Sequence, residues 1–346
     1  MLKKKSLLQS AVVFGSTVLI TLPMAACQSQ VKVASASMEP VIFRGMCDAS
    51  GAVPLSTNRF VIADDEDNVL RVYEVNTGGE PLAVYDISEG LDLHPQPRKK
   101  PGKPPKAPPE LDIEGATKYK GLAYWITSHG RSSSGKYRAE RLNFFATTLG
   151  EAEAPMEVVG KVSEELLADL IADPRMRSFN LAEAAEKAPK EQGGLNIEGL
   201  TERKEGGVWI CFLNPQPQNK ALMVPLLNPE EVIDGKSARF GDPLLLDLNG
   251  RGIRALSWWR GRYLIAAGSY AGDEPSALYT WDGIKPPRLV HLRNADITNP
   301  EAFFTPENRE EIMFFNDQGT RLVDGVECKK LKDSSQKTFT GVWFRL

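Results

Sequence analysis

Short apolar runs alternate with polar and turn-forming residues along the chain, and two of them follow the same short phrase. Residues 111–117 (LDIEGAT) lead into the apolar run 124–127, and residues 195–201 (LNIEGLT) lead into the run 208–211. In both copies a glutamate and a glycine enter a segment with the length and composition of a β-strand. A phrase repeated in this way predicts an array of equivalent structural units.

Weaker copies of the phrase extend the array to five units. They lie at residues 49–52, 252–255 and 299–302, and each is followed by another apolar run. Two further short runs complete a unit, and four strands separated by turn residues are typical of a propeller blade. We therefore predict an all-β fold, a β-propeller of five four-stranded blades, with a sixth blade left open. A strand at 40–44 is expected to close the ring beside the last strand at 340–346.

Two segments interrupt the repeat. Residues 95–109 are rich in proline and lysine, which predicts an extended, solvated loop. Residues 163–188 hold two short helical patterns, the first with Ser163 as N-cap and the second with Asn180 and Glu183 at the spacing of a capping box. We expect a short helical insertion there, which serves either as a lid or as a structural cover.

The first 26 residues have the pattern of a secretory signal peptide. Three lysines at positions 3–5 precede an apolar stretch at 7–22, and two alanines precede Cys27. A cysteine in this position resembles the bacterial lipobox, in which the thiol is lipidated and begins the mature chain. The resemblance implies lipidation of Cys27, a tether at 27–39 and a location in the bacterial cell envelope, facing the periplasm or the cell surface. The alternative is an ordinary signal peptide cleaved nearby.

The remaining chain, residues 40–346, is expected to form one propeller domain that acts as a monomer. It contains no further segment with the roughly 20 consecutive apolar residues of a membrane span. The whole chain has a formal net charge of −3, so charge gives no reason to expect a nucleic-acid partner. Cys211 lies in an apolar run and is expected in the core. Cys47 and Cys328 could pair in an oxidising compartment, and the sequence leaves that pairing open.

Antiparallel pairing turns the repeat into a predicted site, because the start of one strand and the end of the next lie at the same edge of a blade. The repeated position on the first strand holds Ser50, Glu114, Glu198, Arg254 and Glu301. The second strands end in the polar groups Asp64 and Asp65, Ser128 and His129, Asn214, Ser269, and Asn316 and Asp317. If the first strands are innermost, these side chains surround the mouth of the central channel and offer a site for a small or extended polar ligand.

Architectural roles compete with ligand binding at these positions. Glu114 and Glu198 could cap backbone N–H groups of neighbouring blades. Arg254 could serve as the internal counter-ion of Glu198 and Glu301. A ring of that kind would hold the propeller together without binding anything, and the sequence leaves both roles open.

The histidines and the acidic clusters indicate which further residues and which metal ion the site could use. His129 lies in the phrase Ser-His-Gly-Arg, where small residues predict an exposed loop, so His129 and Arg131 join the site candidates. Carboxylates with asparagine suit Ca²⁺, whereas only three histidines in the chain argue against zinc or iron. The densest oxygen cluster, at 64–68, lacks the spacing of an EF-hand, which favours a solvated acidic turn. The sequence contains no phosphate-binding or dinucleotide-binding fingerprint and no G-x-S-x-G.

Several separated phrases resemble an uncharacterised bacterial family, a domain of unknown function. They lie in order at 112–115, 124–130, 196–200, 239–243, 250–254 and 299–302, within a resemblance that runs from residue 43 to the C-terminus. The acid–glycine phrases are also similar, more distantly, to the phytase-like esterase propellers. That resemblance implies a metal-assisted phosphoesterase with Ca²⁺ held by carboxylates. Arg254 departs from an acidic metal site and leaves anion binding open.

Two functions follow from these patterns. The first is a binding propeller whose channel mouth holds a polar ligand through the ring residues. The second is a hydrolase acting on phosphate or ester bonds, with a carboxylate-bound cation as Lewis acid and His129 or Glu198 as general base. We favour the first, because neither a nucleophile–base pair nor a metal-ligand spacing is visible in the sequence.

Overall fold

The computed structural model describes residues 32–36, 39–95, 105–150, 155–293 and 299–346. The predicted signal peptide, the lipidation site Cys27 and part of the 27–39 tether lie outside the described residues, as does part of the 95–109 loop. Contacts group residues Val31–Leu346 into one compact unit. No described helix is both long enough and apolar enough to cross a membrane.

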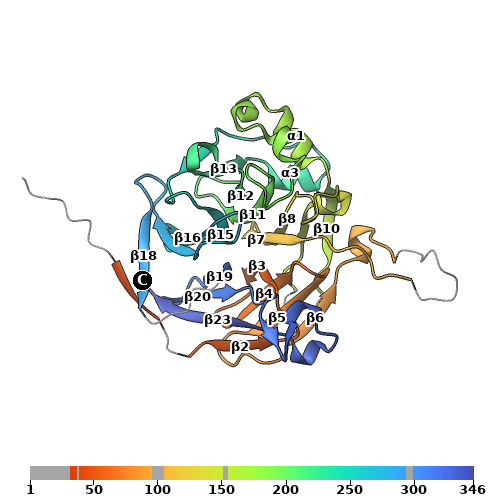
Figure 1. Ribbon diagram of the computed structural model, residues 1–346, viewed down its shortest axis with the longest axis vertical. Coiled ribbons are helices and arrows are strands. Elements are labelled where there is room, and N and C mark those ends of the chain that lie inside the picture. Colours follow the sequence, from red (N-terminus) through yellow and green to blue (C-terminus); the bar gives the residue numbers. More distant parts are fainter. Residues whose placement is uncertain (1–31, 37–38, 96–104, 151–154, 294–298) are drawn as a thin grey trace, which may run out of the picture. The chain divides into compact units, whose positions relative to one another are not determined.

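Five four-stranded antiparallel sheets are arranged around a centre as the blades of a β-propeller (Figure 1). Blade 1 contains β3 (Ala49–Pro54), β4 (Arg59–Asp64), β5 (Val69–Glu74) and β6 (Ala83–Asp86), and blade 2 contains β7 (Ile113–Tyr119), β8 (Leu122–Thr127), β9 (Phe144–Thr147) and β10 (Val158–Ser163). Blade 3 contains β11 (Asn196–Glu202), β12 (Val208–Asn214), β13 (Ala221–Leu226) and β14 (Leu244–Leu246), and blade 4 contains β15 (Gly252–Trp259), β16 (Arg262–Gly268), β17 (Ala277–Trp281) and β18 (Arg288–Arg293). Blade 5 contains β19 (Pro300–Phe304), β20 (Glu311–Asn316), β23 (Thr338–Arg345) and β2 (Val41–Arg44). The predicted propeller is confirmed, and the described residues contain no sixth blade.

The first strand of each blade lies innermost. β3 contacts β7, β7 contacts β11, β11 contacts β15, β15 contacts β19 and β19 contacts β3, which completes an inner ring. The apolar runs of the sequence pack between neighbouring blades. Trp125 of blade 2, for example, is fully buried in a cluster with Val53 and Val61 of blade 1. Burial of these faces between blades supplies the main driving force for the ring.

A β-bulge marks the repeated position in every blade. Ile113 pairs with Thr127 and Gly115 pairs with Ile126, so Glu114 is the extra residue between them. In blades 3, 4 and 5 the same shift of register leaves Glu198, Arg254 and Glu301 as the extra residues. In blade 1 the shift lies between Ala49 and Ala52. A bulge leaves one residue unpaired and re-aims its side chain. The repeated phrase therefore encodes a bulge that takes one side chain per blade out of the regular ladder.

The glycine of the phrase lets neighbouring inner strands approach closely. A Cβ at Gly115 would lie 2.8 Å from the backbone N of Leu200 in blade 3. A Cβ at Gly51 would lie 2.8 Å from the backbone carbonyl carbon of Gly115. Only a residue without a side chain fits at such distances from a backbone. The phrase thus combines a bulge that presents a polar group with a glycine that brings the blades together.

The ring closes through the N-terminal part of the propeller. β2 pairs antiparallel with β23 and places Phe43 opposite Phe339, which confirms the predicted closing strand. The additional strand β1 (Lys32–Ala36) runs parallel to β18 and also pairs with β23. A disulfide joins Cys47 to Cys328, across a sequence separation of 281, while Cys211 is free and buried. Backbone pairing and a covalent bond therefore both connect the ends of the propeller.

The helical insertion lies between blades 2 and 3 and contains α1 (Leu166–Ala172), the 3₁₀ helix η3 (Pro174–Phe179) and α2 (Leu181–Ala184). Leu166, Leu170 and Leu181 are buried in one cluster with strands of both blades, which favours the structural cover over the lid. The predicted N-cap Ser163 is wrong, because Ser163 ends β10 and Glu165 precedes α1. Asn180 does stand at the N-cap of α2, but its side chain makes no capping hydrogen bond. The other short elements are α3 (Pro229–Ile233), η1 (Glu89–Leu91), η2 (Ala139–Arg141), η4 (Pro217–Asn219), η5 (Cys328–Lys330), η6 (Ser334–Gln336), β21 (Leu322–Val323) and β22 (Val326–Glu327).

Candidate functional site

A narrow cavity lies inside the inner ring. Its walls include Glu114, Glu198 and Glu301, together with other residues of the five inner strands. The cavity volume is ≈ 20 Å³, which is room for about one water molecule. The structure therefore brings the three predicted ring glutamates together. Any ligand larger than a water molecule or a single ion has to lie above the cavity, with at most one group inserted.

Arg254 compensates two of these glutamates. Its Nη1 forms an ion pair with Glu301 Oε1 and lies 3.7 Å from Glu198 Oε2. The three side chains are at most 13% exposed, so solvent screens the pairs weakly. Burial lowers the pKa of Arg254, but the two glutamates outweigh burial and raise it, so the guanidinium stays charged. Arg254 is thus a counter-ion of both glutamates, whatever else it binds.

This arrangement leaves buried polar atoms without partners. Asn196 Nδ2 donates a hydrogen bond to Glu198 Oε1 at 2.7 Å, whereas Glu198 Oε2 accepts none. Nε of Arg254 donates none either. Burial raises the pKa of Glu198 to about 7, and attraction to Arg254 opposes that rise only in part. Near neutral pH Glu198 therefore occupies both protonation states, which suits a group that exchanges a proton with a ligand.

Three carboxylates on the other side of the ring lack a cation at ion-pair distance. Within the described part of the chain, no lysine or arginine forms an ion pair with Glu114, Asp64 or Asp65. Burial raises the pKa of Glu114 well above its usual range, and repulsion from Asp112 and Glu198 adds to the rise. Burial, followed by repulsion from Glu114, likewise raises the pKa of Asp65. Carboxylates gathered in this way hold protons or require a cation.

The acidic turn at 64–68 is more buried than the predicted solvated turn. Asp64 is 2% exposed, and its Oδ1 accepts the backbone N–H of Glu66 at 2.9 Å. Asp48 was not among the sequence candidates, yet it is 4% exposed and its carboxylate lies beside those of Asp64 and Asp65. A signal for it exists in the repeat. Asp or Asn stands two residues before the bulged position in four of the five repeats, at 48, 112, 196 and 299.

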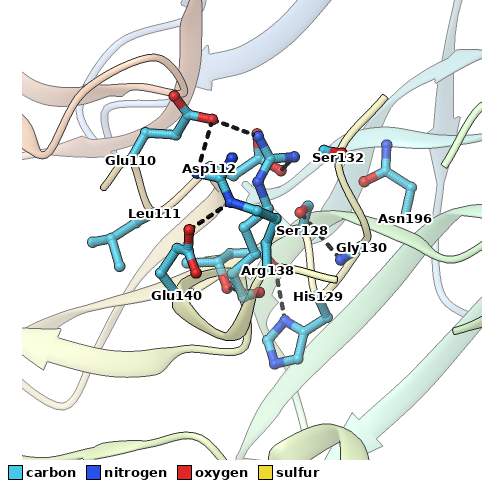
Figure 2. Close-up of polar contacts among 12 residues, drawn as sticks. Glu110, Leu111, Asp112, Ser128, His129, Gly130, Ser132, Arg138, Glu140 and Asn196 are labelled. Carbon is cyan, nitrogen blue, oxygen red and sulfur yellow. Dashed lines mark hydrogen bonds and ion pairs between the residues drawn. The ribbon is translucent and has the colours of Figure 1, made fainter. Parts of the chain in front are cut away.

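Asp112 belongs to a network of ion pairs on blade 2 (Figure 2). Arg141 places Nη1 2.8 Å from Asp112 Oδ2 and Nη2 2.7 Å from Glu110 Oε1. Figure 2 shows Glu110 joined in turn to Arg138, and Arg138 to Glu140. Arg141 lies in η2, outside the repeated phrase, so the repeat gave no reason to select it. Asp112 therefore already has a cationic partner, unlike Glu114 and Asp65.

His129 is buried, which corrects the predicted exposed loop. It is 2% exposed and has a left-handed φ of 55°. Its Nδ1 donates to the carbonyl O of Thr127 at 2.8 Å, while Nε2 has no partner. Burial lowers the pKa of His129 to about 4, so the ring is neutral at neutral pH. In Figure 2 the ring turns away from Asp112 and Glu110.

Arg131 and Asp317 have different positions relative to the ring. Arg131 forms an ion pair with Glu186, and its Nε donates to the carbonyl O of Ala185 at 2.9 Å, so it fastens the helical insertion. Neither Arg131 nor His129 is among the described residues that line the central cavity. Asp317 directly follows β20 and does not line the cavity either, but burial raises its pKa, and its charge raises the pKa of Arg254.

A scan against protein-family models and a search of curated proteins found no match. Among solved structures, the glutaminyl cyclase of Myxococcus xanthus is 9% identical over 91% of this chain and 99% of its own, with a TM-score of 0.46. The PQQ-bound aldose sugar dehydrogenase of Streptomyces coelicolor is 9% identical over 90% of this chain and 100% of its own, with a TM-score of 0.41. A structural genomics protein of unknown function from Bacteroides thetaiotaomicron is 8% identical over 82% of this chain and 57% of its own, with a TM-score of 0.36.

The blades and their bulged inner strands define this chain as a five-bladed β-propeller. The β-propeller predicted from the repeats is therefore confirmed. The likeness to phytase-like esterases and to a domain of unknown function stays a prediction.

Proposed function

We propose that the protein is an exported, lipid-anchored β-propeller that binds a polar ligand above the mouth of its central channel. The observation that carries this proposal is that two buried atoms of the ring, Glu198 Oε2 and Arg254 Nε, make no hydrogen bond. A buried polar atom without a hydrogen bond costs about 1–3 kcal/mol. A ligand that pairs with both atoms recovers that free energy on binding.

The ring limits the chemistry of this ligand. The cavity of ≈ 20 Å³ admits only a small group, so the body of a small or extended ligand lies outside. Glu114 and Glu198 accept hydrogen bonds from hydroxyl or amino groups, while Arg254 donates to an oxygen. A hydroxyl-rich or amino-bearing molecule with at least one acceptor oxygen satisfies both sides of the ring.

Two observations support export. The residues before Cys27 have the pattern of a lipoprotein signal. The Cys47–Cys328 disulfide suits an oxidising compartment such as the periplasm. Fractionation of bacteria that express the full chain tests the anchor: the wild type is expected with the membranes and Cys27→Ala in the soluble fraction. Equal distribution of the two chains would contradict lipid anchoring.

Ligand binding is tested with a chain that starts at Gln28. Its unfolding temperature is measured with glucose, lysine and inorganic phosphate as probes, beside Arg254→Gln and the control Arg59→Gln. Arg59 begins β4, at the edge of the blade opposite Asp64, and its side chain is 58% exposed. At least one probe is expected to raise the unfolding temperature of the wild type and of Arg59→Gln but not of Arg254→Gln. No response to any probe, or an equal response in Arg254→Gln, contradicts the proposal.

The second candidate is metal-assisted hydrolysis of phosphate or ester bonds. The acidic side chains gathered around Asp65 favour it, because a cation there would polarise a substrate oxygen. Glu198, with a pKa of about 7, is a better general base than His129, which lies away from the cavity. Nitrophenyl phosphate and nitrophenyl acetate test this candidate with added Ca²⁺. Turnover by the wild type that Glu198→Gln abolishes would support hydrolysis, and no turnover of either ester would count against it.

A further inference from the structure

Charge compensation is uneven around the channel mouth. On one side, Arg254 pairs with two glutamates. On the other side, Asp48, Asp64 and Asp65 form no ion pair with any described lysine or arginine. Water reaches this side poorly, since Asp48 is 4% and Asp64 2% exposed. Three carboxylates in such surroundings repel one another unless protons or a cation intervene.

Lys329 acts on this side of the ring only from a distance. Its Nζ lies 2.6 Å from Glu66 Oε1, outside the group of three aspartates. Burial lowers the pKa of Lys329, and the ion pair with Glu66 outweighs burial and raises it. The lysine is thus committed to Glu66, and the aspartates keep their excess of negative charge.

The three aspartates converge on one point. Each of Asp48, Asp64 and Asp65 offers a carboxylate oxygen within 4.8 Å of those of the other two. Two oxygens bound to one Ca²⁺ lie at most about 5 Å apart, given a Ca–O distance of about 2.3–2.6 Å. Backbone pairing maintains this arrangement, because Ala49 lies opposite Asp64 and the N–H of Asp65 donates to the carbonyl O of Asp48.

Asp48 provides a second observation that points to a ligand. Its Oδ2 is buried and accepts no hydrogen bond. Its Oδ1 lies against Gly319 of blade 5, where a Cβ would come within 1.6 Å of that oxygen. The absence of a side chain at Gly319 therefore makes room for this carboxylate, whose other oxygen has no partner in the protein. An oxygen held in this way is available to coordinate an ion.

We propose that Asp48, Asp64 and Asp65 bind one divalent cation of the calcium type at the channel mouth. All three donors are carboxylate oxygens, and neither histidine nor cysteine joins the described group, which suits a hard cation rather than zinc. Ca²⁺ tolerates irregular geometry and completes its shell with backbone carbonyls and water, whereas Mg²⁺ demands a near-ideal octahedron. Asp48 precedes β3, Asp64 ends β4 and Asp65 lies in the turn after it. Donors from separate segments of this kind suit the irregular geometry that Ca²⁺ tolerates better than the octahedron of Mg²⁺.

The proposed cation site lies next to the ring of glutamates, but cation binding does not require the polar ligand proposed above. Asp65 also lies within 4.8 Å, oxygen to oxygen, of Asp112 and Glu114. We assign the ion to the first trio because Arg141 already pairs with Asp112. Glu114 neighbours Asp65 and also lines the central cavity, so it connects the ion with the proposed ligand site. The inference underlies the second candidate function, but cation binding is measured without substrate or turnover.

Calorimetry tests the site directly. The chain that starts at Gln28 is stripped with EDTA, dialysed and titrated with CaCl₂, and with MgCl₂ in a parallel arm. We expect saturable binding of one Ca²⁺ per chain, stronger than that of Mg²⁺. Asp48→Asn and Asp64→Asn should each weaken Ca²⁺ binding about tenfold or more, since even loss of an outer-shell partner has effects of that size. Glu205→Gln, an exposed carboxylate in the turn between β11 and β12, should keep the wild-type affinity.

Thermal unfolding provides a second readout that separates ion binding from a folding defect. In EDTA, Asp48→Asn should unfold at a higher temperature than the wild type, because it removes a buried repulsion. With saturating Ca²⁺ this order should reverse. Absence of Ca²⁺ binding by the wild type, unchanged affinity in both aspartate variants, or preference for Mg²⁺ would overturn the proposal. Ca²⁺ binding by a chain that responds to none of the probes would contradict ligand binding alone, and a probe response without Ca²⁺ binding would contradict the cation site alone.

Discussion

Arg254 occupies the space that a side chain at Gly268 would need. A Cβ at Gly268 would lie 2.4 Å from Arg254 Nε and 2.9 Å from its Cδ. Gly268 ends β16, the strand beside the one that carries Arg254. The other second strands end in Asp, Thr or Asn. Blade 4 thus differs at two coupled positions, and the glycine allows an arginine where three other blades carry Glu and one carries Ser.

Gly268→Ala tests this coupling. The added methyl group should displace the Arg254 side chain and lower the free energy of unfolding by about 1–3 kcal/mol, as overpacking does in other interiors. Chemical denaturation of Gly268→Ala, Arg254→Gln and the double variant measures the effect. The alanine should cost less stability when Arg254 has already been replaced. Additive effects in this cycle would mean that the two residues do not compete for space.

Gly115→Ala tests the close approach of the inner strands. Because the neighbouring atom is the backbone N of Leu200, no side chain can move aside, and blades 2 and 3 must separate. We expect a loss of about 1–3 kcal/mol in unfolding free energy. Ala255→Gly, at the equivalent position of blade 4, is the control and should cost only about 0.5–1 kcal/mol through backbone entropy. Equal losses would show that the glycine is not needed for packing.

Removal of the disulfide should destabilise the closed ring. Cys47 and Cys328 are 281 positions apart, so the bond restricts a very long loop of the unfolded chain. Replacement of both cysteines by serine is expected to lower the unfolding free energy by about 2–5 kcal/mol. Urea unfolding of the variant is compared with that of the wild type with and without reductant. If reductant destabilises the double variant as much as the wild type, the bond is not the cause.

His129 should make stability fall in mild acid. Its pKa is about 4 in the folded protein and about 6.5 when exposed, so between these values only the unfolded chain takes up the proton. The neutral imidazole therefore contributes stability above pH 6.5 that is lost as the pH falls, approaching about 3 kcal/mol below pH 4.

His129→Asn isolates this contribution, because asparagine tolerates the left-handed φ and does not titrate. The difference in unfolding free energy between wild type and variant should be constant above pH 7. It should shift in favour of the variant between pH 6.5 and 4. A difference that is independent of pH over the whole range would show that His129 becomes protonated as easily in the folded chain as in the unfolded chain.

The repeat in the sequence predicts much of the architecture because most strand pairs of a propeller join neighbouring segments of the chain. Blades 1 to 4 pair strands that follow one another along the chain, so the phrase at 111–117 and its copies predict the blades and the inner ring position. The phrase does not predict the bulge, because a bulge is a mismatch of register between two strands and the phrase covers only one of them. It becomes visible only when Glu114 is seen unpaired between Ile113 and Gly115.

The site was predictable in part for the same reason. Glu114, Glu198, Arg254 and Glu301 occur at one repeated position, and the ring brings them to one cavity or ion-pair cluster. The prediction of an exposed His129 was wrong because it rested on the small residues beside it. The loop that carries it lies under other parts of the chain, and local composition does not report what covers a loop.

The amino-acid order alone determines the number and kind of blades, since strand pattern and turn residues act over short distances. Only the folded ring decides which charges meet. Asp48 precedes the first inner strand and meets Asp64 and Asp65 because two strands pair, and it fits because Gly319 of the last blade leaves room. Contacts across such separations depend on ring closure, so charge, burial and unpartnered oxygens at the channel mouth are properties of the tertiary structure.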